Sequence, residues 1–134
     1  MSIENKLKNH INYIYDCNKD ETLDYCFTKF YEYENNDEEL ANYFFKMIGE
    51  IILGIYHNPS LVVPTIKATS MEKKMIVDAA YEFSYENNNG LQGPLKNTFG
   101  ELIDSSVEEP FIVPYMQLIK IMQHNKEKVS KIAN

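Results

Sequence analysis

Residues 36–59 read NDEELANYFFKMIGEIILGIYHNP, and this stretch decides the fold. Apolar side chains recur along it at helical spacing, and after Met47 they occupy nearly every side of the predicted helix. A helix that is apolar all round is buried, so we expect it to lie at the centre of the fold, with the other helices around it. Its apolar stripe consists of Leu40, Tyr43, Phe44, Met47, Ile48, Ile51, Ile52 and Ile55.

The ends of this central helix carry recognisable signals. Asn36 and Glu39 have the spacing of a capping box, which predicts a start at Asn36. His57-Asn58-Pro59 should end the helix, because the residue before a proline disfavours helical geometry. Gly49 and Gly54 lower helix propensity, and we expect them to let a neighbouring helix approach closely.

The rest of the chain is divided in the same way. Ser2 can cap a first helix, a second ends near Asn35, and Thr69 with Glu72 forms another capping-box pattern. Residues 60–68 could be a short helix or an extended segment. Further helices are predicted over 71–86, over 95–105 behind Pro94, and after 108–110. The sequence predicts an all-α fold, a single domain over 1–134 with six or seven helices around a central apolar helix.

Composition narrows the classes of function. The chain has 134 residues, a formal net charge of −7 and no arginine among its 13 basic residues, which argues against nucleic-acid binding. No apolar run is long enough to span a bilayer, and the first residues show no secretory signal, so we expect a cytoplasmic protein without a membrane partner. Cys17 and Cys26 are expected to be free thiols, with Cys26 in the core.

The charge is concentrated in residues 20–39. This segment has eight acids and one base, Lys29, so its formal charge equals that of the whole chain. Aromatic anchors and complementary charge are typical of surfaces that bind a protein partner. We therefore predict that a basic protein partner binds through Asp20, Glu21, Asp24, Tyr25, Glu32, Glu34, Asp37, Glu38 and Glu39.

Helical periodicity places these residues more finely. With Leu23, Phe27 and Phe30 facing inward, Tyr25 falls on the opposite face and should lie in solvent between acids. Tyr31 and Tyr33 lie at the flanks and should be partly buried. Acids in a first helical turn complement the helix dipole, which explains Asp37, Glu38 and Glu39 but not Asp24, Glu32 or Glu34.

The sequence signals for catalysis are weaker than the signal for partner binding. Glu50 and His57 are seven residues apart, so a continuous helix would place them on one face, where a buried Glu beside a His could do acid–base chemistry. A structural pair is the competing interpretation. The three histidines have no metal-ligand spacing, and no phosphate-binding loop is present. We predict no catalytic residues, no metal site and no cofactor.

The chain resembles toxin-neutralising immunity proteins of bacterial contact-dependent growth-inhibition systems. The features that it shares with them are small size, lysine as the only basic residue, acidic residues concentrated at 20–39 and the lack of a catalytic motif. That resemblance implies a cytoplasmic protein that binds the toxic domain of one cognate toxin, often a basic nuclease, and blocks its active site or its access to the target. The alternatives are a phage inhibitor of a host enzyme, a viral helical antagonist of the Bcl-2-like type, or a small enzyme using Glu50 and His57.

Overall fold

The computed structural model describes residues 2–56, 59–86, 89–104 and 111–133. The described residues form six α-helices and one 3-10 turn, without a strand, so the prediction of an all-α fold is confirmed. These elements are α1 (Ile3–Tyr15), α2 (Lys19–Tyr33), α3 (Glu38–Leu53), α4 (Ser70–Glu86), η1 (Asn89–Leu91), α5 (Gln92–Ile103) and α6 (Ile112–Ala133).

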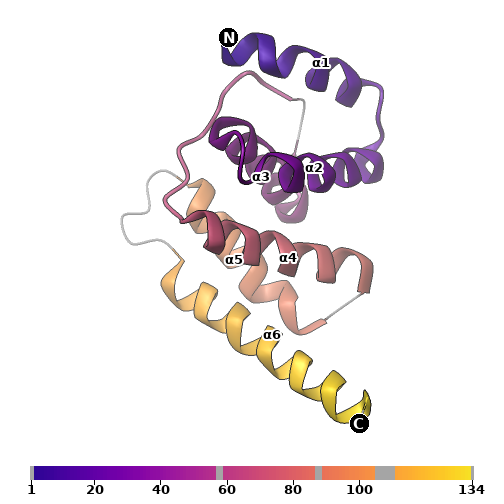
Figure 1. Cartoon of the computed structure of the whole chain (residues 1–134), viewed down its shortest axis with the longest axis vertical. Helices are drawn as coiled ribbons and strands as arrows, with labels where there is room; N and C mark the ends of the chain where they lie inside the picture. Colours follow the sequence, from indigo (N-terminus) through magenta and orange to yellow (C-terminus); the bar gives the residue numbers. More distant parts are fainter. Residues whose placement is uncertain (1, 57–58, 87–88, 105–110, 134) are drawn as a thin grey trace.

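The central position of α3 is confirmed. Ten of its sixteen residues are buried, and it packs against α1, α2, α4 and α5. Along the long axis of the molecule, α1 lies at one end and α6 at the other, with the α2–α3 pair next to α1 (Figure 1). Buried side chains from all six helices join one hydrophobic cluster.

Helix α3 starts one residue later than the capping-box pattern predicted. Asp37, not Asn36, is the N-cap, and its carboxylate accepts the N–H of Leu40 at 3.2 Å. The Asn36 side chain instead donates to the carbonyl of Glu32, at 3.0 Å. Both residue types can cap a helix, so the pattern located the helix start but chose the wrong residue.

The end of α3 was predicted too late. Gly54 adopts a left-handed φ of 77°, and the N–H groups of Gly54 and Ile55 return to the carbonyls of Ile51 and Glu50. This is the common glycine termination of a helix, and it outweighs the apolar pattern that continues beyond it. Ile55, predicted in the buried stripe, is 51% exposed. Gly54 is therefore a helix terminator and not a packing residue.

Gly49 does allow a close helix approach, as predicted. A Cβ at this position would lie 2.5 Å from Ile103 Cδ1 and 2.6 Å from Phe99 Cδ1, both on α5. Because Cβ contacts below 3.0 Å essentially never occur, only a glycine lets α5 pack this closely against α3.

Most other boundaries agree with the sequence. Ser2 caps α1, and the reciprocal hydrogen bonds of Thr69 with Glu72 open α4. Residues 60–68 are not helical, which settles the open alternative in favour of an irregular crossing segment. The predicted start behind Pro94 is wrong, because helix α5 begins at Gln92, two residues before the proline.

The predicted start of the last helix at 108–110 lies outside the described residues, and α6 begins at Ile112. Just before it, the N–H of Phe111 donates to the carboxylate of Glu101 on α5. With 22 residues α6 is the longest helix, yet neither it nor any other described helix is apolar enough over sufficient length to cross a bilayer.

Candidate partner-binding surface

The outer face of α2 carries most of the predicted binding residues. Its buried side chains, Thr22, Cys26, Phe27 and Phe30, point toward the core. Leu23, predicted to face inward, is only half-buried, and Thr22 takes a buried position instead. The opposite face is solvent-exposed at four acids that we call the acidic ridge: Asp20, Glu21, Asp24 and Glu32.

Two members of the acidic ridge also have local partners. Glu21 accepts the N–H of Asn18 at 3.2 Å and completes the capping box of α2. Glu32 pairs with Lys29, at 2.9 Å. Asp20 and Asp24 make no ion pair within the described part of the chain. The ridge therefore presents negative charge, and the lysine that lies between its members along α2, Lys29, is already paired.

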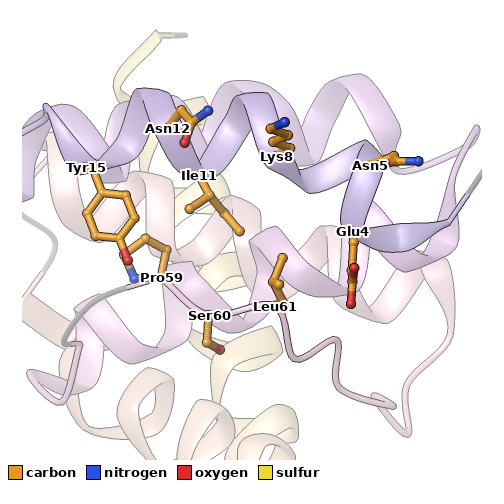
Figure 2. A pocket seen from close by; sticks show the side chains of 9 residues that line it. All are labelled: Glu4, Asn5, Lys8, Ile11, Asn12, Tyr15, Pro59, Ser60 and Leu61. Atoms are coloured by element: carbon orange, nitrogen blue, oxygen red, sulfur yellow. The ribbon is translucent and has the colours of Figure 1, made fainter.

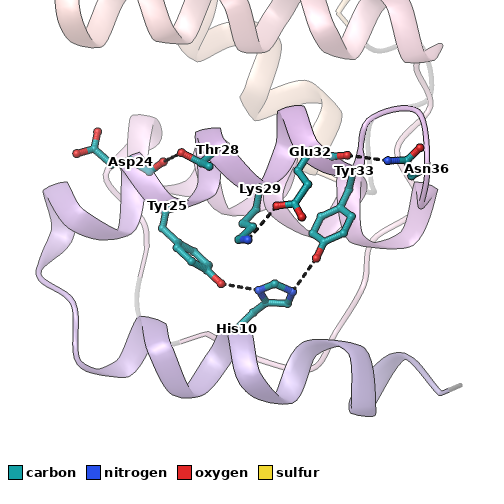
Figure 3. A network of polar contacts seen from close by, with 8 residues as sticks. All are labelled: His10, Asp24, Tyr25, Thr28, Lys29, Glu32, Tyr33 and Asn36. Atoms are coloured by element: carbon teal, nitrogen blue, oxygen red, sulfur yellow. Dashed lines mark hydrogen bonds and ion pairs between the residues drawn. The ribbon is translucent and has the colours of Figure 1, made fainter.

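Tyr25 does not lie in solvent, so its predicted exposure is wrong. Its hydroxyl is 2.6 Å from Nδ1 of His10, and its ring stacks on Tyr13 with centroids 4.5 Å apart. Figure 3 shows α1 running along this flank of α2, with His10 directed toward Tyr25. The periodicity of α2 identified the face toward α3, but it could not reveal that α1 covers a second flank.

His10 joins two tyrosines of α2. Its Nε2 lies 3.3 Å from the hydroxyl of Tyr33, while Nδ1 faces Tyr25 (Figure 3). A neutral imidazole has one donor and one acceptor nitrogen, so one tyrosine donates and the other accepts. Burial, and then the charge of Lys29, lower the pKa of His10 and favour this neutral form.

The sequence analysis did not identify His10 as a contact residue. The available signal was its position three residues after Leu7 and four before Ile14, the two buried residues of α1. The predicted partial burial of Tyr31 and Tyr33 is confirmed. Tyr31 donates to Asp78 of α4 at 2.5 Å; burial, and then this contact, raise the pKa of Tyr31.

Asp37 is a structural residue. It caps α3, and its carboxylate pairs with Lys6 of α1 at 2.8 Å. Burial alone would raise the pKa of Asp37, but hydrogen bonds from Lys6 and from the N–H of Leu40 outweigh it and lower the pKa. Glu38 and Glu39 are exposed in the first turn of α3, where their charge suits the helix dipole.

Glu34 has no comparable explanation. It is the half-buried C-cap residue of α2, where a negative charge opposes the helix dipole. Its Oε2 atom is buried and has no hydrogen-bond partner in the part of the chain that the structure describes. Glu32 also lies near the C-terminal end of α2, where the helix dipole is unfavourable for a negative charge.

Two surface cavities adjoin α1. One, of about 400 Å³, lies between α1 and α2 and is called the notch; its lining residues are Tyr13, Glu21, Asp24, Tyr25, Thr28 and Lys29. The other, of about 600 Å³, lies between α1 and the segment 59–61. In Figure 2, Ile11 points toward Ser60 and Leu61, and Tyr15 lies beside Pro59.

The two cavities differ in charge. Glu4 and Lys8 are the charged residues of the larger one, and they offset each other. The notch instead has two carboxylates, those of Glu21 and Asp24, while the charge of Lys29 is offset by Glu32 outside the lining. The notch is therefore the cavity whose charge suits a basic partner.

The catalytic alternative loses its geometric premise. That alternative required one helix to run through residues 50–57, but α3 ends at Leu53, and His57 lies outside the described residues. Glu50 is half-buried, with Oε1 at 3.6 Å from Lys46 Nζ. Among the described residues, no three His, Cys, Asp or Glu side chains converge to hold a metal ion.

We compared the chain with models of protein families, with curated proteins and with solved structures. None of them matches it. A function must therefore be argued from the acidic ridge and the residues around it.

Proposed function

We propose that this protein binds a basic protein partner through the acidic ridge of α2. In its most concrete form, it is an immunity protein that neutralises a basic toxin domain, such as a nuclease, by covering its active site or its access to the target. The observation that carries the proposal is the exposure of four carboxylates on one face of one helix, where the lysine within that run, Lys29, is already paired with Glu32.

Charge of one sign along a helix has a defined effect on association. It attracts a basic partner over about one Debye length, roughly 8 Å at physiological salt, and orients it during the encounter. Such attraction can raise association rates by about 10- to 1,000-fold and falls steeply as ionic strength rises.

The acids at the end of α2 support a binding role. Glu32 and Glu34 lie near the C-terminal end of α2, where the helix dipole makes a negative charge unfavourable. Glu32 is paired with Lys29, whereas the buried Oε2 atom of Glu34 has no hydrogen-bond partner in the described part of the chain. A polar group that costs stability without a structural return is typical of functional surfaces.

The first experiment is affinity capture from lysate of the source organism, with a salt gradient, a final denaturing elution and mass spectrometry to identify the partner. The association rate of the purified pair is then measured by stopped flow at several salt concentrations. The test variant carries Asp20→Asn, Asp24→Asn and Glu32→Gln, which remove three ridge charges and leave the Glu21 cap intact.

The matched control carries Glu4→Gln, Asp16→Asn and Asp104→Asn, three exposed acids outside residues 20–39, so that net charge changes equally. We expect the ridge variant to associate at least about tenfold more slowly at low salt and the control to change much less. Equal rates for the two variants would refute the ridge as the binding surface.

A further inference from the structure

We infer that the notch binds an arginine side chain of the basic partner; this inference rests on the proposed function and identifies the group that anchors the complex. The notch lies beside the acidic ridge and is an open surface hollow of about 400 Å³. Figure 3 shows four of its lining side chains, Asp24, Tyr25, Thr28 and Lys29.

One side of the notch is an aromatic stack. The rings of Tyr13 and Tyr25 lie 29° from parallel with centroids 4.5 Å apart. Tyr25 is held in place by the hydrogen bond to His10 and by an edge-to-face contact with Phe44. Tyr13 remains 53% exposed, so a large part of its ring is open to solvent. A planar guanidinium stacks well on such a ring.

The acids that complete the notch lie one helical turn apart on α2. Asp24 makes no ion pair among the described residues, and Glu21 uses only Oε1 for its cap. Carboxylate oxygens accept the N–H groups of a guanidinium in strong charge-assisted bonds. A stacked cation at Tyr13 would therefore find carboxylates beside it.

Lys29 does not prevent a second cation from binding. Its Nζ is held by Glu32 at 2.9 Å, which offsets its charge. The same Nζ lies 5.5 Å from the ring centroid of Tyr25, so this aromatic group already accommodates a cation in the folded protein. With Lys29 compensated, the lining keeps the net negative charge of Glu21 and Asp24.

Arginine suits this site better than lysine. The ammonium of lysine is a compact, strongly hydrated charge, whereas the guanidinium is less hydrated, planar and able to stack and to form bidentate bonds at the same time. The notch offers both a ring surface and carboxylates, so it should prefer arginine where the ridge alone would accept either base.

The test uses three synthetic peptides as probes: hexaarginine, hexalysine, and hexacitrulline as a neutral isostere of hexaarginine. Their affinities for the intact protein are measured by NMR titration at low salt. We expect hexaarginine to bind more tightly than hexalysine, and hexacitrulline to show no binding. Tyr13→Ala should weaken hexaarginine binding by about threefold to thirtyfold, whereas Tyr13→Phe should retain it.

Tyr15→Ala is the matched control, because Tyr15 is a similarly exposed tyrosine on α1 outside the notch. Equal losses for Tyr13→Ala and Tyr15→Ala, or equal affinities of hexaarginine and hexalysine, would overturn the notch inference. If hexaarginine still binds the parent protein, and binds the ridge variant more weakly, the proposed function survives that result. If hexaarginine binds no better than hexacitrulline, the notch inference is refuted, while the association rates of the ridge and control variants with the captured partner decide the proposed function separately.

Discussion

Replacing Gly49 by alanine tests the closest contact in the core. A Cβ there would overlap Ile103 and Phe99 at 2.5 and 2.6 Å, and Phe99 is fully buried. Overpacking of this kind costs about 1–3 kcal/mol, and the gain in helix propensity from glycine to alanine returns about 1 kcal/mol. We expect a net loss of up to about 2 kcal/mol in the free energy of unfolding.

Gly100→Ala is the control, because Gly100 lies within α5 and the nearest side chain of another helix, Leu53 of α3, would be 4.0 Å from the new Cβ. This variant should be more stable than the parent by up to about 1 kcal/mol. Urea denaturation followed by circular dichroism gives both values, and the two variants should differ by the overpacking cost, about 1–3 kcal/mol. Gly49→Ala as stable as Gly100→Ala would refute the packing argument.

Three further predictions concern titratable and polar groups. Burial lowers the pKa of His10, so unfolded chains bind more protons and stability should fall as pH drops below about 6.5; His10→Gln should flatten this slope in thermal melts at pH 5–7. Lys73 is 3% exposed and donates to Asn42 at 2.7 Å. The double variant Asn42→Leu with Lys73→Met should be about 1–2 kcal/mol more stable than the parent in urea, while Asn42→Leu alone, which unpairs the lysine, should be less stable. Burial raises the pKa of the Cys26 thiol, so iodoacetamide should alkylate half-buried Cys17 in the native protein and reach Cys26 only on unfolding, as peptide mass mapping would show; equal labelling would contradict this.

Local sequence signals predicted most of the fold, because caps, glycines and helical periodicity act over a few residues. They located the central helix, the α4 capping box and the close approach at Gly49. The errors occurred where two local signals competed. At Gly54 the left-handed terminator ended the helix although the apolar stripe continued.

The candidate site was less predictable, because it depends on which helices meet. The exposure of Asp20, Glu21, Asp24 and Glu32 follows from the period of one helix. The burial of Tyr25 and the pairing of Asp37 with Lys6 depend on where α1 packs. No pattern within residues 20–39 contains that information.

The attachment of α1 has a consequence for how the protein recognises a partner. Only Leu7 and Ile14 of its thirteen residues are buried, so its amide hydrogens should exchange with solvent through local opening well before the core exchanges. Tyr13 moves with this helix, and each opening would therefore dismantle the aromatic side of the notch. A ligand that binds there should slow hydrogen exchange along α1, which makes the protection of this helix a reporter of occupancy.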